Sequence, residues 1–110
     1  MLTNLQKQGE DELVVMTLNL HTYQENDQAR KLALIAEAIA TWQVDLVAFQ
    51  ECAQHKKSLQ VANRVREDNM AYLICQQLQS VHHQNYAFVW DWAHYGWDVW
   101  EEGLAVLSRS

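Results

Sequence analysis

The sequence predicts an α/β fold (α+β in some classifications), because strand-like and helix-like stretches alternate along its first half. Residues 12–20, ELVVMTLNL, are apolar at successive positions, which is typical of a strand covered on both faces. Apolar residues then recur every three or four positions from Asp27 to Trp42, which predicts an amphipathic helix capped by Asn26 or Asp27. Residues 45–52, DLVAFQEC, predict a second buried strand. We therefore expect a strand–helix–strand unit with parallel strands.

The second half of the chain predicts a polar loop, a helix and two further strands. Residues 53–67 are polar and partly basic, as expected of a solvated loop. A helix should start at the Asp-Asn pair of residues 68–69, since either side chain can cap it. A strand should begin near Tyr86 and change into a loop over residues 94–98. Residues 103–110, GLAVLSRS, predict the last strand.

Composition limits the possible functions. The chain has 110 residues, of which 49% are apolar, so it is long enough for one domain with one hydrophobic core. Its formal charge of −6 disfavours tight nonspecific binding to DNA. The two cysteines have neither the number nor the spacing of a disulfide framework or a zinc finger. Because no apolar stretch reaches the length of a membrane-spanning segment or a signal peptide, we expect a cytoplasmic protein.

Polar side chains follow both predicted parallel strands at the point where each strand ends. Asn19 and His21 close the first strand, and Gln50 and Glu51 close the second. Since ligands of α/β sheets bind outside the carboxyl ends of the strands, we expect these groups to lie close together. A carboxylate beside neutral oxygen and nitrogen donors suits a hard divalent cation that keeps waters for a substrate phosphate. Glu51 would be its anchor.

Three segments, VMTLNLHTY, VDLVAFQEC and EEGLAVLSRS, resemble the endonuclease/exonuclease/phosphatase superfamily of metal-dependent phosphodiesterases, which has the deoxyribonuclease-I-like fold. The resemblance is greatest to bacterial members with a DN pair before a helix and an H-x-G-[YW] loop before EEG. The matching residues here are Asp68, Asn69, His94, Gly96, Trp97, Glu101, Glu102 and Gly103. The resemblance covers residues 12–110 as a partial domain, and residues 1–11 are expected to form an N-terminal extension.

The resemblance implies specific roles for four residues, and strand alternation adds a fifth candidate. Asn19 matches the family's Asn that orients the phosphate or the metal shell, and Glu51 matches its principal Mg²⁺ ligand. His94 is a further catalytic candidate, and Glu102 is a candidate for the surroundings of the substrate phosphate. His21 lies two positions after Asn19, so strand alternation would point it to the same side, where it could contact a phosphate oxygen. The implied reaction is hydrolysis of a phosphodiester or phosphomonoester by water, with Mg²⁺ or Mn²⁺ as cofactor.

Family members also continue well past the LSR strand, with G-D-x-N and S-D-H-like segments that this sequence lacks. The resemblance therefore implies the N-terminal half of a four-layer α/β/β/α sandwich, truncated on its C-terminal side and feeble or inactive alone. The inner sheet face would then be uncovered, and the fragment could self-associate through it.

The sequence also allows other interpretations, and one of them stays open. The chain could be a non-catalytic remnant of the same fold that binds a metal or a partner. A dinucleotide-binding module is disfavoured, because the turn after the first strand, LNLHTYQEN, lacks the glycines that such modules need. An aromatic cluster could stack nucleobases, but the acidic charge favours core and loop packing for it. Its members are Trp90, Trp92, Trp97 and Trp100.

Overall fold

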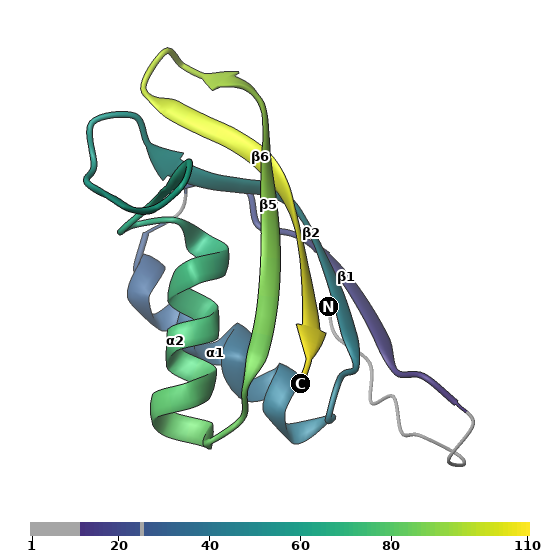
Figure 1. The fold of residues 1–110 in the computed structure, drawn as a ribbon. Coiled ribbons are helices and arrows are strands. Elements are labelled where there is room, and N and C mark those ends of the chain that lie inside the picture. Colours follow the sequence, from purple (N-terminus) through teal and green to yellow (C-terminus); the bar gives the residue numbers. More distant parts are fainter. Residues whose placement is uncertain (1–11, 25) are drawn as a thin grey trace.

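A computed structural model describes residues 12–24 and 26–110, so the predicted extension over residues 1–11 lies outside the described part. The chain forms a four-stranded sheet in the order β1-β2-β6-β5, with two helices on one face (Figure 1). A separate two-stranded hairpin pairs β3 with β4. The elements are β1 (Val15–Asn19), α1 (Gln28–Thr41), β2 (Leu46–His55), β3 (Gln60–Ala62), β4 (Val65–Arg66), α2 (Met70–His82), β5 (Tyr86–Gly96) and β6 (Trp100–Arg109).

The predicted strand–helix–strand unit is confirmed. β1 and β2 pair in parallel from Val15 opposite Leu46 to Asn19 opposite Gln50. Asp27 occupies the N-cap position of α1, but its backbone is left-handed and its side chain makes no capping hydrogen bond within the described residues. The predicted N-cap position is therefore confirmed at Asp27, although its side chain does not cap the helix.

The cap predicted for the second helix is confirmed at Asn69. Its Oδ1 accepts hydrogen bonds from the backbone N–H groups of Ala71 and Tyr72, at 3.0 and 3.2 Å. These bonds satisfy two of the N–H groups that a helix start otherwise leaves without partners. Asn69 is also fully buried, so the cap fixes the start of α2 against the sheet.

The hydrophobic core lies between the sheet and the two helices. Side chains alternate along β6, where Ala105 and Leu107 are buried and Leu104 and Val106 are exposed. This alternation separates a buried face under the helices from an open face on the other side. The open face also carries Val15 of β1 and Val89 of β5, which are likewise exposed. Within residues 12–24 and 26–110, no helix or strand covers this partly apolar face, as expected from the sequence.

Two predicted loops are wrong, because cross-strand pairing extends further than the local pattern indicates. Residues 53–67 contain the end of β2 and the β3–β4 hairpin rather than a solvated loop, and Ala53 and Gln54 are fully buried. Residues 94–98 contain the end of β5, since His94 pairs with Glu102 of β6. Figure 1 shows the far ends of β5 and β6 reaching past the helices as a two-stranded arm.

A tight turn ends this arm. Trp97 and Asp98 both have positive φ, 50° and 60°, and the N–H of Val99 donates to the carbonyl of Gly96. Two consecutive positive-φ residues are the signature of a hairpin turn whose twist matches that of its strands. The structure thus accommodates an Asp where Gly is more usual, and the strands continue up to the turn.

Candidate active site

A β-bulge places Glu51 at the edge of the open face. Phe49 pairs with Ala105 and Cys52 pairs with Gly103, so two residues of β2, Gln50 and Glu51, lie opposite a single residue of β6. Glu51 itself has a φ of 48°, in the left-handed region. Bulges of this kind redirect side chains and are common beside functional sites. The bulge explains how a strand with a buried middle presents a carboxylate where it leaves its parallel partner.

Hydrogen bonds confirm that the ends of β1 and β2 bring their polar side chains together. Asn19 Nδ2 donates to Glu51 Oε2 at 2.7 Å. Gln50 Nε2 donates to Thr17 Oγ1 at 3.0 Å, which places Gln50 on the same open face. Asn19 also has a local role, because its Oδ1 accepts a hydrogen bond from the N–H of His21 at 2.8 Å. The amide therefore connects the turn after β1 to the carboxylate of Glu51.

The segment after β1 wraps around the bulge. The N–H groups of Leu20 and Thr22 donate to the carbonyls of Gln50 and Glu51, at 2.8 and 3.1 Å. His21 and Thr22 both have positive φ. The strand therefore ends at Asn19, and strand alternation does not place His21 beside it. His21 is exposed, and its contact with a phosphate stays a prediction.

His94 and Glu102 form a second polar pair, on neighbouring strands of the arm. His94 Nε2 lies 3.9 Å from Glu102 Oε1, and the side chain of Glu102 is only 13% exposed. A Cβ atom on Gly96 would lie 1.9 Å from Glu102 Oε2, so this glycine makes room for the carboxylate. Glu102 pairs with Ala53, two residues after Glu51 along β2, and no hydrogen bond or ion pair within the described residues links it to Glu51 or Asn19.

Neither cysteine of the chain is suited to a role in the site, although Cys52 follows Glu51 directly in the sequence. Cys52 is fully buried under the helices, and this burial raises the pKa of its thiol to about 12. Cys75 on α2 is half-buried, and burial raises the pKa of its thiol to about 12 as well. Both cysteines are therefore neutral thiols at neutral pH, unsuited to nucleophilic attack or metal binding.

The donors at the bulge fit a hard divalent cation only in part. Glu51 offers a carboxylate and Asn19 an amide, whereas Mg²⁺ commonly uses one or two carboxylates together with waters and substrate phosphate. Among residues 12–24 and 26–110, no three His, Cys, Asp or Glu side chains are grouped so that they could hold a metal ion. The described residues thus supply the start of a site whose other ligands would come from water, substrate or other protein groups.

Sequence reasoning missed a buried hydrogen-bond network next to this site. Gln54 Nε2 donates to the carbonyl of Arg64 and to Glu101 Oε1, while Gln54 Oε1 accepts from Arg66 N and Asn69 Nδ2, all at 2.8–2.9 Å. The polarity of residues 53–67 predicts a solvated loop, but Gln54 is completely buried and both polar atoms of its side-chain amide are hydrogen-bonded. The network ties the hairpin to β6 and α2.

Glu101 is the charged centre of the network. Its Oε1 accepts a hydrogen bond from Arg66 Nε at 2.8 Å. Desolvation raises the pKa of the Glu101 carboxyl, but the hydrogen bonds from Arg66 and Gln54 and the charge of Arg66 outweigh it, so the pKa is lowered. Glu101 is therefore a structural carboxylate, whereas its neighbour Glu102 faces the open side.

A comparison with solved structures shows which known protein has a similar fold. No protein-family model and no curated protein matches the sequence. Among solved structures, an endonuclease/exonuclease/phosphatase family protein from Leptotrichia buccalis C-1013-b superposes with a TM-score of 0.84 and 30% sequence identity. The match covers 88% of this chain but only 37% of that protein. The chain thus has the mixed α/β fold of part of an endonuclease/exonuclease/phosphatase family protein, which confirms the resemblance indicated by its sequence motifs.

Proposed function

We propose that this chain supplies part of the active site of a metal-dependent phosphoric ester hydrolase. The observation that carries the proposal is the contact between Asn19 and Glu51, held by a bulge at the carboxyl ends of two parallel strands. The likeness to a family protein supports the same class of reaction. Because the chain spans 37% of that protein, the complete domain, a four-layer α/β/β/α sandwich, would carry the activity.

In this proposal Mg²⁺ or Mn²⁺ is held by Glu51 and supported by Asn19. A bound divalent cation polarises a phosphoryl oxygen and neutralises charge that develops on the leaving group. Asn19 keeps the Glu51 carboxylate in position, since its amide donates to Oε2 and leaves Oε1 to face a ligand. His94 and Glu102 could hold a proton near the substrate on the same sheet face, because small rotations bring their 3.9 Å separation to hydrogen-bond distance.

The substrate class is a phosphoester, either a small molecule or a nucleic acid. The net charge of −6 favours a small phosphoester, because a long polyphosphate is repelled by an acidic protein. No helix in the described part of the chain is long and apolar enough to cross a membrane. We place the reaction in the cytoplasm, in line with Cys52 and Cys75, which are free thiols rather than a disulfide.

Hydrolysis of bis(p-nitrophenyl) phosphate and p-nitrophenyl phosphate by the complete gene product tests the proposal. We expect turnover with Mg²⁺ or Mn²⁺, none in excess chelator, and a loss of at least about a hundredfold in Glu51→Gln. Glu37→Gln is the matched control, because Glu37 is exposed on α1 in the helical layer. Near-normal metal-dependent activity of Glu51→Gln would remove this residue from the metal site.

A second candidate function, binding without catalysis, is favoured by the small number of metal-binding groups. Within the described residues, the side chains of Glu51 and Asn19 are hydrogen-bonded to each other, and no group of three or more His, Cys, Asp or Glu side chains could hold a metal ion. A remnant of the fold would keep its partner in excess chelator, whereas hydrolysis would stop. The same chelator titration therefore distinguishes the two functions.

We also propose that the isolated chain self-associates through its open sheet face. Apolar side chains of three strands are exposed there, namely Val15, Val89, Leu104 and Val106. Soluble monomers rarely leave a continuous apolar patch uncovered. Sedimentation of wild type and Val106→Lys tests this. A smaller oligomer in the lysine variant supports the proposal, and equal sedimentation coefficients contradict it.

A further inference from the structure

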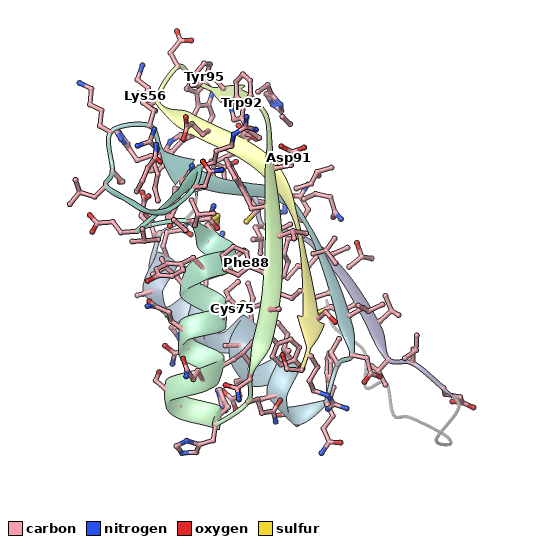
Figure 2. The ribbon with its side chains drawn as sticks, in the orientation of Figure 1. Lys56, Cys75, Phe88, Asp91, Trp92 and Tyr95 are labelled. Atoms are coloured by element: carbon pink, nitrogen blue, oxygen red, sulfur yellow. The ribbon has the colours of Figure 1, made fainter. Side chains whose placement is uncertain are left out.

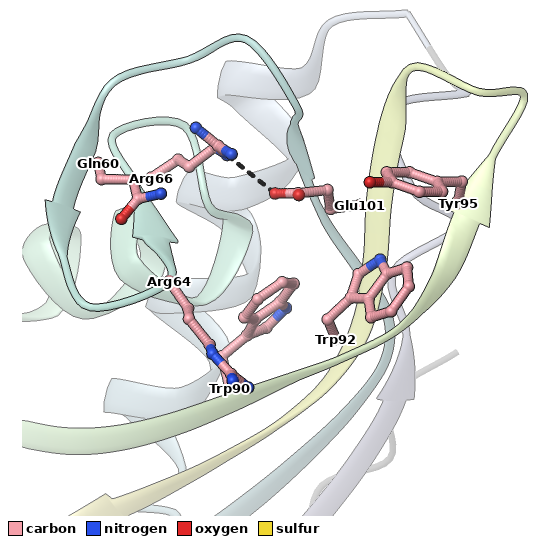
Figure 3. Close-up of a pocket in the computed structure, with 7 residues that line it drawn as sticks. All are labelled: Gln60, Arg64, Arg66, Trp90, Trp92, Tyr95 and Glu101. Atoms are coloured by element: carbon pink, nitrogen blue, oxygen red, sulfur yellow. Dashed lines mark hydrogen bonds and ion pairs between the residues drawn. The ribbon is translucent and has the colours of Figure 1, made fainter.

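A pocket lies on the other side of the arm from His94 and Glu102. It has a volume of about 270 Å³ and opens between the β3–β4 hairpin and strands β5 and β6 (Figure 3). Glu101 pairs with Gln54, which faces the helices, whereas Glu102 pairs with Ala53 on the open face. The pocket is therefore separate from the Asn19–Glu51 site. Its lining residues are Gln60, Arg64, Arg66, Trp90, Trp92, Tyr95 and Glu101.

Three aromatic residues, Trp90, Trp92 and Tyr95, form one wall of this pocket, and only one of them packs against the hydrophobic core. Trp90 packs against the core, and its indole N–H donates to the carbonyl of Cys52 at 2.9 Å. Trp92 and Tyr95 remain 46% and 51% exposed, with ring centroids 5.2 Å apart in an edge-to-face arrangement. Figure 2 shows both rings at the end of the arm, beyond the helices. Core packing thus accounts for Trp90 but not for Trp92.

The two arginines of the pocket differ in what they already bind. Arg66 Nε donates to Glu101, and its Nη1 donates to the carbonyl of Ser58 at 2.7 Å. The guanidinium of Arg64 makes no hydrogen bond or ion pair to any described residue, and its side chain points toward the aromatic wall (Figure 3). The backbone of Arg64 is nevertheless fixed, because its carbonyl accepts from the buried amide of Gln54 at 2.8 Å. In Figure 3 this side chain ends beside Trp90, so an uncommitted cation lies at the aromatic wall that Trp92 and Tyr95 continue.

We propose that this pocket binds a nucleoside monophosphate unit. A base can stack on Trp92, because aromatic side chains bind bases through their ring faces. Arg64 can bind the phosphate with charge-assisted hydrogen bonds. Glu101 uses Oε1 for both of its hydrogen bonds, so Oε2 can accept from an amino group of a base. The volume is just below the range of about 300–1,000 Å³ of typical ligand sites, which suits one nucleotide rather than an extended ligand.

The pocket would work independently of the bulge. It uses no residue of the Asn19–Glu51 pair and no metal, so nucleotide binding should survive excess chelator. If the pocket does not bind a nucleotide, the proposed hydrolase function is unaffected. Likewise, loss of hydrolysis in Glu51→Gln does not test nucleotide binding in the pocket. The shared chemistry, a base linked to a phosphate, can come from a free nucleotide or from a single strand of nucleic acid.

Titration of the chain with AMP in excess chelator, followed by tryptophan fluorescence and by calorimetry, tests the proposal. We expect Trp92→Ala to weaken AMP binding by about tenfold or more, the usual effect of losing a base-stacking ring. Trp97→Ala is the matched control, because Trp97 lies on the same arm, is 69% exposed and does not line the pocket. Adenosine and ribose 5-phosphate should each bind more weakly than AMP.

Arg64→Gly separates binding from folding. Arg64 has a φ of 65°, which glycine adopts at no steric cost, so the variant should fold at least as well as wild type. We expect it to weaken AMP binding by about tenfold and adenosine binding hardly at all, since only the phosphate contact is lost. Arg30→Ala, an exposed arginine on α1, should change neither.

Three results would overturn the proposal: no binding of AMP, binding that requires a divalent cation, or equal binding by wild type, Trp92→Ala and Arg64→Gly. A short oligoadenylate in the same titration identifies the source of the nucleotide. Tighter binding of the oligonucleotide through Trp92 and Arg64 indicates a strand, and equal or weaker binding indicates a free nucleotide. Either ordering supports the pocket as a nucleotide site.

Discussion

Glycine at position 51 should make the chain more stable than alanine at the same position. Both Glu51→Gly and Glu51→Ala remove the carboxylate and its hydrogen bond to Asn19, so the comparison isolates the backbone. The left-handed φ of 48° costs an L-residue about 1–2 kcal/mol. Glycine in turn lowers the stability by about 0.4–1 kcal/mol relative to alanine, because it makes the unfolded chain more flexible. The expected difference is thus about 1 kcal/mol in favour of glycine.

Urea denaturation, followed by circular dichroism, measures this difference in the free energy of unfolding. The protein concentration is chosen so that the variants have equal sedimentation coefficients and therefore the same oligomeric state. A difference of about 1 kcal/mol corresponds to about 4–8 °C in Tm for a domain near this size. A higher stability of Glu51→Ala, or equal stabilities, would mean that the bulge does not hold residue 51 in a left-handed conformation. The explanation of how β2 presents its carboxylate would then be wrong.

Three further predictions concern the packing and the buried network. Gly103→Ala should lower the free energy of unfolding by about 1–3 kcal/mol in urea melts, because its Cβ would lie 2.1 Å from the carbonyl oxygen of Asp91. Gly96→Ala should cost less, since the atom it meets belongs to a flexible side chain; the reverse order would contradict this packing. Gln54→Leu should cost about 3 kcal/mol or more, because several buried groups lose their partners, and a loss under about 1 kcal/mol would refute the network. The lowered pKa of Glu101 predicts a contribution to stability that is fully present above about pH 4.3 and is lost as pH falls through its folded pKa; a pH-independent difference between wild type and Glu101→Gln would contradict it.

The sequence predicted the parts of the fold that depend on local pattern. Apolar spacing located both helices and the parallel pairing of β1 with β2, and the amide of Asn69 marked the start of α2. Convergence of Asn19 and Glu51 followed from the same topology and is confirmed by their hydrogen bond. These features depend on residues near one another in sequence or on a connection with few alternatives.

The features that the sequence did not predict depend on residues that lie far apart in the sequence. Gln54 is polar and reads as a surface residue, but 47 residues separate it from Glu101, its partner in the buried network. The bulge at Glu51 likewise follows from the register between β2 and β6, and no local signal such as a glycine marks it. Trp92 lies on the helix side of the arm, and its exposure depends on where α2 begins relative to that arm.

Binding of Mn²⁺ to the chain, measured by electron paramagnetic resonance, tests most directly whether the bulge is a metal site. We predict weak binding by wild type that falls at least about tenfold in Glu51→Gln, since even residues that only support a metal ligand lower affinity by about that factor. Glu37→Gln should bind as wild type does, because Glu37 lies on α1. Equal Mn²⁺ affinity of wild type and Glu51→Gln, or no binding by wild type, would contradict the assignment of Glu51 as the metal anchor.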